Sequence, residues 1–254
     1  MITLSSDFGS PYPAAMKGVI LQQSTARLVD VSHDFPRGDV RSTAFWLREI
    51  LPYFPPAVHL VVVDPGVGTD RAAIVLQAGE HVLVGPDNGV LVPTARRYAG
   101  EAFDVFEIDD AAAESATFHG RDVFAPAAAV VHDAAFDRLD ALELLDLVES
   151  YVDLRFPEPA IGNRTAEGTV LVIDGFGNAI TNVPGDAVAE WQGARVDVNG
   201  TPVPFERCYA DVQAGEPLLT VGSHGNVELA VNGGRGDECF GVEEGSAVRL
   251  SWEE

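Results

Sequence analysis

The sequence predicts an α/β domain followed by a smaller all-β domain. In the first part of the 254-residue chain, strand-like runs alternate with helix-like segments, the pattern of a three-layer domain around a mostly parallel sheet. Residues 155–168 carry prolines and glycines without periodicity and read as a linker. Beyond them lie short strand-like runs with glycine- and asparagine-rich turns. We therefore predict an α/β domain at residues 1–154 and a β-barrel domain at residues 169–254.

The first predicted elements alternate between strand and helix. Residues 1–4 and 27–32 are short runs typical of strands, and residues 14–23 between them read as a helix. Residues 38–54 read as an amphipathic helix, with Asp39 as a suitable N-cap. Its apolar stripe consists of Val40, Ala44, Leu47 and Leu51.

The middle of the first domain is predicted to hold its most buried strand. Residues 57–64 form an apolar run of the kind found inside parallel sheets. The strands at 72–77 and 81–85 are separated only by "AGE", so we expect a hairpin. The domain is completed by a helix at 90–100, a strand at 102–108 and a helix at 122–133.

The second domain is predicted from its turns. "VNGTPV" is a good hairpin signal, and other glycine- and asparagine-rich turns punctuate the remaining strands. The strand-bearing segments are 169–183, 194–205, 217–234 and 246–254.

The charge balance indicates an acidic surface. The chain has 16 basic and 39 acidic residues, which gives a formal net charge of −23. Lys17 is the single lysine. With 46% hydrophobic residues the chain is too apolar to be disordered. We interpret the charge as an adaptation to molar salt, where the Debye length is about 3 Å. An ordinary acidic protein is the alternative. No basic patch favours nucleic-acid binding.

Compartment and membrane partners are also expected from the sequence. No run of about 18 apolar residues is present, and the N-terminal stretch lacks the features of a signal peptide. Cys208 and Cys239 have no metal-type spacing. We expect a cytoplasmic protein with reduced thiols and no membrane partner.

Polar residues follow two strands of the first domain. Asp7 comes just after the first strand, where α/β sheets bind ligands and a carboxylate can hold a ribose diol. In "LVVVDPGVGTDR", Asp64 ends a buried strand and Arg71 follows a tight turn. An Asx turn at Asp7 and a structural ion pair at Asp64 and Arg71 are the alternatives.

Three further stretches carry candidate residues. His119 precedes a predicted helix, and a lone histidine is more often structural than catalytic. The turns at 174–178 and 222–225 could be plain hairpins or could offer a carboxylate, a phenylalanine and backbone groups to a small ligand. No P-loop, dinucleotide fingerprint, nucleophile elbow or metal signature is present.

Six motifs in order carry a family resemblance across nearly the whole chain. They are "SSDFG", "VVVDPGVGTDR", "GPDNGVL", "TFHGRDVFAP", "DGFGNAITN" and "GSHGNVELAVNGG". The chain resembles the S-adenosylmethionine (SAM) hydroxide adenosyltransferases, relatives of the SAM-dependent fluorinase and chlorinase. The resemblance implies an α/β domain plus a β-barrel, assembled as a homotrimer that binds SAM between subunits. It implies hydrolysis of SAM to adenosine and L-methionine.

The resemblance assigns catalysis to Asp64, Arg71 and His119. A sulfonium is a good leaving group, so neither a metal nor a cofactor is expected, and SAM itself is the substrate. The difficulty is the nucleophile, because free water has a pKa of about 15.7. A guanidinium can stabilise hydroxide character, while a carboxylate and an imidazole orient and deprotonate water.

The resemblance also assigns the polar ends of the substrate. Asp7 would bind the ribose hydroxyls and Asp174 the methionine ammonium. Ser223 would meet the methionine carboxylate. His224 stands where the halogenases carry an arginine, so its role is the least defined of the set.

The adenine contacts complete the implied site. Phe176 would stack on adenine and Asn178 would hydrogen-bond to it, while Val231 and Asn232 lie on the stretch whose backbone reads the adenine edge. Lys17 matches no substrate contact, and we expect a structural or interface role for it.

Two positions distinguish the chain from the halogenases. These carry a tyrosine at the position of Asp64 and a halide-contacting serine at that of Gly120. A carboxylate would repel a halide by about 4 kcal/mol at 4 Å and an effective dielectric of 20. The halogenases also have a long insertion where this chain has "AGE". A halogenase and a non-catalytic adenosine- or SAM-binding module are the alternatives to a hydrolase, and the preferred sulfonium epimer stays open.

Overall fold

A seven-stranded sheet organises the first unit of the chain, Met1–Arg155, in the strand order β2-β1-β3-β5-β4-β6-β7. The computed structural model describes residues 1–109, 118–134 and 136–252, and the strand count refers to these residues. The strands are β1 (Ile2–Ser6), β2 (Leu28–Ser32), β3 (Val58–Val62), β4 (Ala73–Ala78), β5 (His81–Pro86), β6 (Asp104–Ile108) and β7 (Leu145–Val148).

The sheet is mixed, so the prediction of a mostly parallel sheet is wrong. The pairs β1–β2, β1–β3 and β3–β5 are parallel. The pairs β4–β5, β4–β6 and β6–β7 are antiparallel. Connection length explains the change at β4, because only Gly79 and Glu80 join β4 to β5 and so short a link permits only a hairpin. The hairpin itself was predicted and is confirmed.

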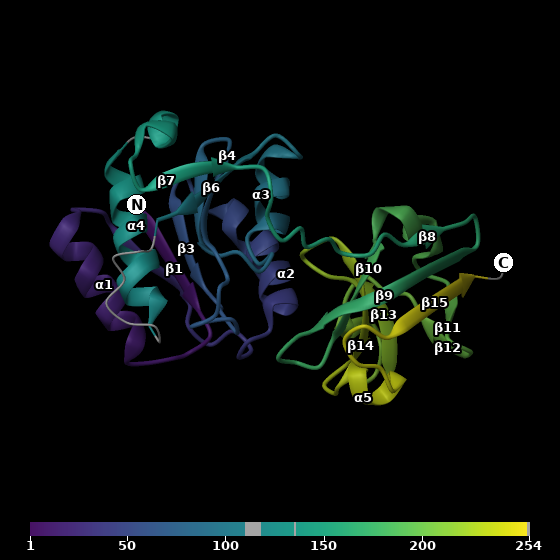
Figure 1. Ribbon diagram of the computed structural model, residues 1–254. Helices are drawn as coiled ribbons and strands as arrows, with labels where there is room; N and C mark the ends of the chain where they lie inside the picture. The colour runs from purple at the N-terminus through teal and green to yellow at the C-terminus, as the bar shows by residue number, and fades with distance from the viewer. Residues whose placement is uncertain (110–117, 135, 253–254) are drawn as a thin grey trace. The chain divides into compact units, whose positions relative to one another are not determined.

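Helices cover both faces of this sheet (Figure 1). α1 (Tyr12–Gln23) and α4 (Ala125–Asp133) lie together on one face, and α2 (Val40–Ile50) and α3 (Val92–Ala99) lie on the other. The predicted N-cap of α2 is confirmed, since Asp39 Oδ1 accepts a hydrogen bond from Ser42 N at 2.9 Å. The short helical turns of the unit are Leu51–Tyr53, the π-helical turn Gly120–Phe124 and Phe136–Ala141.

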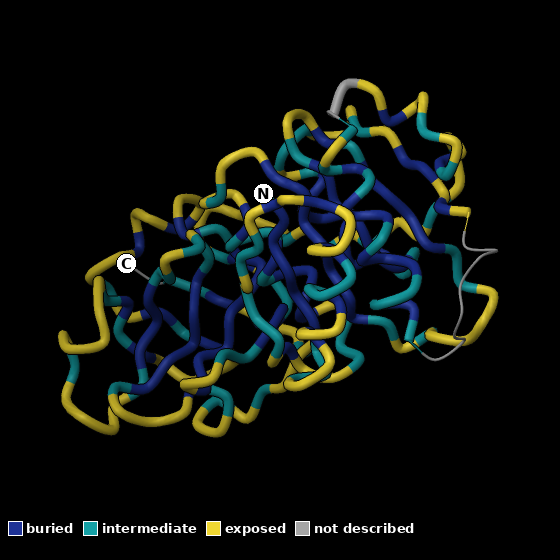
Figure 2. The backbone as a smooth tube through the Cα atoms, turned by 90° about the vertical axis from the view of Figure 1, so that its left-hand side faces the viewer, coloured by how far each residue is buried: buried dark blue, intermediate teal, exposed yellow. Residues whose placement is uncertain are grey.

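One polar cluster lies inside the apolar core of the first unit. His59 Nδ1 is 2.8 Å from Thr3 Oγ1, and its Nε2 is 3.0 Å from His81 Nδ1 and 3.2 Å from the Tyr98 hydroxyl. The rings of His81 and Tyr98 stack with centroids 3.9 Å apart. Burial, reinforced by His81, lowers the pKa of His59 to about 3. The interior strands β1 and β3 are buried along their whole length. Figure 2 shows how buried segments run through the inside of the chain.

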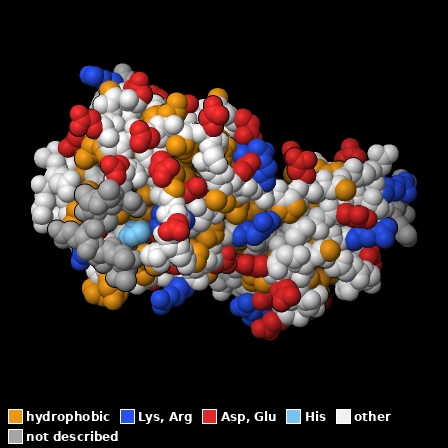
Figure 3. All heavy atoms as spheres, viewed as in Figure 1, with side chains coloured by type: hydrophobic (Ala, Val, Ile, Leu, Met, Phe, Trp, Pro, Cys, Tyr) orange, Lys and Arg blue, Asp and Glu red, His pale blue; other side chains and the backbone are white. Residues whose placement is uncertain are grey.

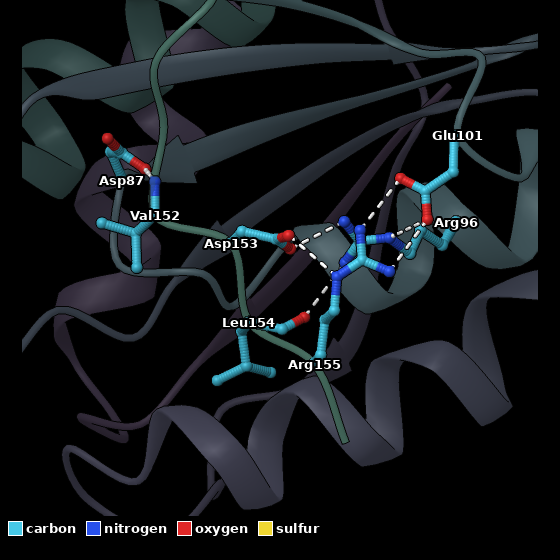
Figure 4. A network of polar contacts seen from close by, with 7 residues as sticks. All are labelled: Asp87, Arg96, Glu101, Val152, Asp153, Leu154 and Arg155. Atoms are coloured by element: carbon cyan, nitrogen blue, oxygen red, sulfur yellow. Dashed lines mark hydrogen bonds and ion pairs between the residues drawn. The ribbon is translucent and has the colours of Figure 1, made fainter. Parts of the chain in front are cut away.

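Residues 149–155, which we call the strap, run back across the first unit and are held by charged side chains (Figure 4). Arg96 Nη2 lies 2.7 Å from Asp153 Oδ1, and its Nε donates to Glu101 Oε1 at 2.8 Å. Arg155 donates to Glu101 at 3.1 Å and to Asp153 at 2.9 Å. Burial is the largest single influence on the pKa of Asp153 and raises it, but the hydrogen bonds and charges of Arg96 and Arg155 together outweigh burial and lower this pKa.

A second anchor ties the strap to the turn after β5. Val152 N donates to Asp87 Oδ1 at 2.8 Å, and burial raises the pKa of this carboxyl group despite that bond. Gly89 has a φ of +89°, and a Cβ there would lie 2.6 Å from Leu154 Cβ. Glycine is therefore needed both for the turn and for the close approach of the strap.

The second unit, Phe156–Glu254, is built from antiparallel strands in the order β12-β11-β15-β9-β10-β14-β13, with β8 paired to β9. A bridge between Phe205 and Leu219 brings the two edges together, so the sheet is a nearly closed barrel. The strands are β8 (Ala160–Ile161), β9 (Thr165–Ile173), β10 (Ala179–Pro184), β11 (Arg195–Val198), β12 (Thr201–Pro204), β13 (Pro217–Val221), β14 (Asn226–Val231) and β15 (Ala247–Trp252).

The second unit also contains short helices that the sequence did not predict. They are Asp186–Trp191, Tyr209–Asp211 and α5 (Gly236–Phe240). β8 lies within the predicted linker, and the domain limits drawn at 154 and 169 stay a prediction. The last two residues of the predicted strand at 246–254 lie outside the described residues.

Both cysteines lie within the described residues. Cys208 and Cys239 are free and exposed. None of the helices in the described part of the chain has the length and apolarity needed to cross a membrane.

Candidate active site

Asp7 and Asp64 come from neighbouring parallel strands. β1 pairs with β3 in a register that sets Ser6 opposite Val62, so the residues that follow both strands emerge at the same edge of the sheet. The Asp7 carboxylate accepts a hydrogen bond from Gly38 N at 2.6 Å through Oδ2. The parallel pairing therefore explains why two carboxylates 57 positions apart in sequence (64 minus 7) flank one place in the fold.

Asp64 and Arg71 form a two-pronged ion pair. Arg71 Nε donates to Asp64 Oδ1 at 3.1 Å, and Arg71 Nη2 donates to Oδ2. Gly66 N also donates to Oδ1 at 3.1 Å, and Arg71 Nη1 donates to the carbonyl of Ala72 at 2.7 Å. The side chains of Asp64 and Arg71 are 5% and 9% exposed, so the pair is largely removed from water. A guanidinium held by this many bonds is a fixed positive charge.

His119 completes the cluster. Arg71 Nη2 lies 3.2 Å from His119 Nδ1. Because a guanidinium only donates, Nδ1 is the acceptor, and the ring hydrogen of the neutral imidazole sits on Nε2. His119 immediately precedes the π-helical turn, whose Phe124 ring lies 5.2 Å from the Arg71 guanidinium carbon. Thr117, which opens the predicted "TFHGRDVFAP" motif, lies outside the described residues.

The predicted polar residues of the first unit share one pocket. Asp7, Asp64 and His119 line a cavity of about 90 Å³, which has room for water. The structure therefore brings these three residues together with Arg71, which binds both Asp64 and His119.

Two aromatic side chains, Phe8 and Phe118, line the pocket, and Tyr12 packs against both of them. Phe8, Tyr12 and Phe118 contact one another edge to face, with ring centroids 5.7 to 6.2 Å apart. Gly120 also lines the pocket. A Cβ at Gly120 would lie 2.9 Å from Met16 Sδ and 3.2 Å from the Phe118 ring, so only glycine fits here without movement of its neighbours.

A hydrogen-bonded chain supports the loop that carries Asp7. Ser6 Oγ is 2.7 Å from His33 Nδ1, His33 Nε2 is 3.0 Å from Asp30 Oδ1, and Lys17 Nζ donates to Asp30 Oδ2 at 2.6 Å. Although burial raises the pKa of Asp30, its bonds to Lys17 and His33 lower it overall. Ser6 is fully buried, so this Ser–His–Asp arrangement offers no nucleophile to a substrate. Its role is structural, because it holds the end of β1 immediately before Asp7. Lys17 thus has the kind of structural contact that the sequence analysis expected.

Asn88 is a supporting residue that the sequence analysis did not single out. Its Nδ2 donates to the carbonyl of Val63 at 2.9 Å, and its Oδ1 accepts from Val90 N at 3.1 Å. Asn88 therefore fixes the backbone immediately before Asp64. Its position inside the "GPDNGVL" motif was the available signal.

In the second unit, the turn between β9 and β10 gathers three predicted residues. Asp174 Oδ1 accepts from Phe176 N at 2.9 Å and from Asn178 N at 2.8 Å. Asp174 Oδ2 accepts from Asn178 Nδ2 at 3.0 Å. The Phe176 side chain is 81% exposed and free to stack on a flat ligand, whereas Asn178 is buried.

The turn between β13 and β14 carries Ser223 and His224. Ser223 is exposed. His224 turns inward, because Asn226 N donates to its Nδ1 at 3.2 Å and its Nε2 lies 3.0 Å from Glu228 Oε1. Glu228 was also missed by the sequence analysis, although a charged residue within the buried strand "NVELAV" was a signal.

Val231 and Asn232 follow the same strand. Val231 O accepts from Gly234 N at 3.2 Å, and Asn232 N donates to Glu216 O at 3.1 Å. Asn232 Nδ2 donates to Val212 O at 2.8 Å. These groups are held inside the unit, and their predicted contact with adenine stays a prediction.

The cluster combines a carboxylate, an imidazole and a guanidinium. Among the described residues, no group of three or more His, Cys, Asp or Glu side chains is arranged to hold a metal ion. The cluster can orient a water molecule, accept its proton at a carboxylate and stabilise negative charge with a guanidinium.

Fold and site place the chain among two-domain proteins that join an α/β unit with polar strand ends to a barrel-like β unit. The family model for the SAM hydroxide adenosyltransferase N-terminal domain matches residues 2–141, and the model for the C-terminal domain matches residues 168–249. The chain belongs to the SAM hydroxide adenosyltransferase family.

Curated relatives agree with this assignment, and a solved structure shares the fold. An (R)-S-adenosyl-L-methionine hydrolase from Salinispora tropica is 42% identical, with 98% of this chain and 97% of that protein covered. A second (R)-S-adenosyl-L-methionine hydrolase, from Thermus thermophilus, is 41% identical, with 96% of this chain and 97% of that protein covered. A fluorinase from Actinopolyspora mzabensis is 23% identical over 99% and 97%. A crystal structure of a conserved Thermotoga maritima protein has a TM-score of 0.85 at 33% identity, covering 99% and 100%.

Proposed function

We propose that the chain hydrolyses SAM to adenosine and L-methionine. The observation that carries this proposal is the Asp64–Arg71–His119 cluster on a pocket shared with Asp7. Family membership and hydrolase relatives at about 40% identity support it.

In this proposal the pocket aims one water molecule at the ribose C5′. The water oxygen forms a bond to C5′ while the C5′–S bond breaks. The electron pair of the C5′–S bond stays on the sulfur, which leaves as the thioether of methionine. Asp64 accepts the water proton at Oδ2, which keeps a second acceptor position beside its bond from Arg71 Nη2. His119 has no such position, because Arg71 occupies Nδ1 and Nε2 carries a hydrogen. His119 Nε2–H and the Arg71 guanidinium stabilise the developing hydroxide. No metal and no cofactor takes part.

Substrate-binding roles follow the same proposal. Asp7 binds the ribose hydroxyls, and Asp174 binds the methionine ammonium. Ser223, with His224 beside it, faces the methionine carboxylate. Phe176, Asn178, Val231 and Asn232 form the adenine contacts.

Product analysis tests the reaction. Purified protein is incubated with SAM in oxygen-18 water containing molar KCl, and products are separated and weighed by mass spectrometry. We expect adenosine labelled at its 5′ oxygen together with unlabelled methionine. A 5′-chloroadenosine product would instead identify a halogenase, and bound but unreacted SAM would identify a binding module.

The epimer is proposed from the names of the relatives, which are (R)-S-adenosyl-L-methionine hydrolases. We expect the (R)-sulfonium epimer to be consumed faster than the (S) epimer when each is supplied separately. Equal rates of hydrolysis for the two epimers would contradict the proposed epimer preference but not the proposed hydrolysis of SAM.

We propose that the active form is a homotrimer whose site combines the first unit of one subunit with the second unit of the next. The predicted residues are divided between the units, which supports a shared site. Asp64→Asn and Asp174→Asn should each be nearly inactive alone. Co-assembled in equal amounts, they should regain about a quarter of the wild-type sites, since one interface in four pairs two intact halves. No recovery in verified mixed trimers would contradict a shared site.

The proposed setting is cytoplasmic. Two free, exposed thiols support it, because oxidising compartments favour disulfides. The net charge of −23 supports the absence of a nucleic-acid partner.

A further inference from the structure

Glu228 is a buried carboxylate that the proposed reaction does not use. It is 4% exposed and lies in the middle of β14, between the buried residues Val227 and Leu229. An ionised carboxylate in such a place is costly unless hydrogen bonds satisfy its oxygens. The partners of Glu228 therefore indicate what its burial supports.

Each oxygen of Glu228 holds a side chain from a different segment. Its Oε1 lies 3.0 Å from His224 Nε2, and its Oε2 accepts from the Tyr209 hydroxyl at 2.6 Å. Because Asn226 N donates to His224 Nδ1, the ring hydrogen lies on Nε2 and points at Glu228. Both ring nitrogens are thus engaged, which fixes the orientation of the imidazole.

The network continues from Tyr209 to Asp174. Asn178 Nδ2 lies 3.4 Å from the Tyr209 hydroxyl oxygen and 3.0 Å from Asp174 Oδ2, and it donates to both. Tyr209 therefore accepts from Asn178 and donates to Glu228. Burial, then the hydrogen bond and charge of Glu228 and the charge of Asp174, raise the pKa of Tyr209, so it remains a donor. One connected network links the turns that carry Asp174 and His224.

The packing around Glu228 and His224 leaves no room for a side chain at position 222. A Cβ on Gly222 would overlap Glu228 Oε1 and lie 2.6 Å from His224 Nε2. The φ of Gly222 is outside the left-handed region, so the requirement for glycine here is spatial. The turn is shaped around the His224–Glu228 pair.

We propose that Glu228 and Tyr209 are positioning residues for the amino-acid end of SAM. The proposal rests on the proposed function, in which Asp174 binds the ammonium group and Ser223 the carboxylate. Glu228 orients the turn of Ser223 through His224, and Tyr209 orients Asp174 through Asn178. The Glu228 charge also adds to the attraction for a cationic ammonium. His224 acts here through its bond to Glu228 and shapes the carboxylate subsite.

The test compares two ligands that differ only at the amino-acid end. S-adenosyl-L-homocysteine carries the aminobutyrate chain, whereas 5′-methylthioadenosine has only a methyl group on the same sulfur. Calorimetry on the full chain gives Kd for both. Glu228→Gln should weaken S-adenosyl-L-homocysteine about tenfold and leave 5′-methylthioadenosine nearly unchanged. Tyr209→Phe also removes a partner of the adenine contact Asn178, so it should weaken S-adenosyl-L-homocysteine several-fold and 5′-methylthioadenosine clearly less. In each variant the KM for SAM should rise by a factor similar to that for the Kd of S-adenosyl-L-homocysteine, whereas kcat should fall much less.

Matched controls and a second variant keep the test decisive. Glu190→Gln and Tyr53→Phe change exposed residues of the same types and should leave both affinities unaltered. Tyr209 is 40% exposed, so Tyr209→Phe remains informative if Glu228→Gln fails to fold. Unchanged ratios of the two Kd values, or equal weakening of both ligands with a lower Tm, would overturn the positioning role. If the wild-type chain neither binds these ligands nor hydrolyses SAM, the proposed function itself fails.

Discussion

At the scale of single residues, the hydrogen bonds among Asp64, Arg71 and His119 determine which of these side chains can act as the base. Arg71 binds both oxygens of Asp64 and also the Nδ1 of His119. The guanidinium therefore ties the carboxylate and the imidazole into one unit with fixed proton positions. The two-pronged geometry, rather than positive charge alone, is what this arrangement requires.

Arg71→Lys tests that requirement, because lysine keeps the charge but cannot donate in a planar fork. We expect kcat for SAM hydrolysis to fall by about 100-fold, while the KM changes little. Arg97→Lys, at an exposed position on α3, serves as the control and should retain full activity. Near-normal turnover by Arg71→Lys would mean that charge suffices and that the geometry is incidental.

Sequence alone could predict the residues of the cluster but not their bonds. Asp64, Arg71 and His119 stand in motifs, so their types and positions were accessible. The proton position on His119 depends on a contact with a residue 48 positions earlier, which no local pattern encodes. Tyr209 had no signal at all, because its partners Asn178 and Glu228 come from two different strands or turns.

At the scale of elements, connection length and buried polar contacts shape the first unit. The helices α1 to α4 and the strands other than β7 were predicted from periodicity, whereas β7 was not predicted. The sheet was predicted as mostly parallel because alternation alone does not report strand direction. The link of Gly79 and Glu80 reverses the chain between β4 and β5. The cluster of Thr3, His59 and His81 then joins β1, β3 and β5 across the sheet.

His59 makes this part of the sheet sensitive to acid. Its pKa of about 3 in the folded chain lies below the ordinary value of 6.5, so the unfolded chain binds more protons between these values. The stabilising contribution is therefore complete above pH 6.5 and is lost as pH falls toward 3. His81 beside it also has a lowered pKa, through burial, and changes in the same direction.

Chemical denaturation at a series of pH values should detect this effect in His59→Gln. The variant should be less stable at neutral pH, by on the order of 1–2 kcal/mol, because it disturbs a buried hydrogen-bonded site. Its free energy of unfolding should fall less steeply than that of the wild type between pH 6.5 and the acid transition. Parallel curves for the two proteins would show that His59 is not the group responsible.

At the scale of the whole molecule, excess negative charge is the dominant property. Acidic side chains are scattered over the face seen in Figure 3 and do not gather in a single patch. With a net charge of −23, their mutual repulsion opposes the folded state at low ionic strength. We propose that the protein is adapted to high salt, where this repulsion is screened.

Thermal unfolding in dilute buffer and in molar KCl measures that adaptation. We expect Tm to rise by on the order of 10 °C with salt, because screening relieves repulsion chiefly in the compact state. Sucrose at matched osmolality separates screening from general solute exclusion. A Tm that is high and unchanged in dilute buffer would identify an ordinary acidic protein.

The crowding around Gly120 has an evolutionary consequence. A halide-contacting serine at this position, as in the halogenases, would press its Cβ against Met16 and Phe118, both already packed in place. Any side chain at position 120 therefore requires Met16, on α1, and the Phe118 ring to move by a few tenths of an ångström. A lineage that acquired a serine here would have to absorb this loss of packing at the same step as any change of nucleophile. The close packing of one glycine thus couples a change of chemistry to a repacking of its neighbours.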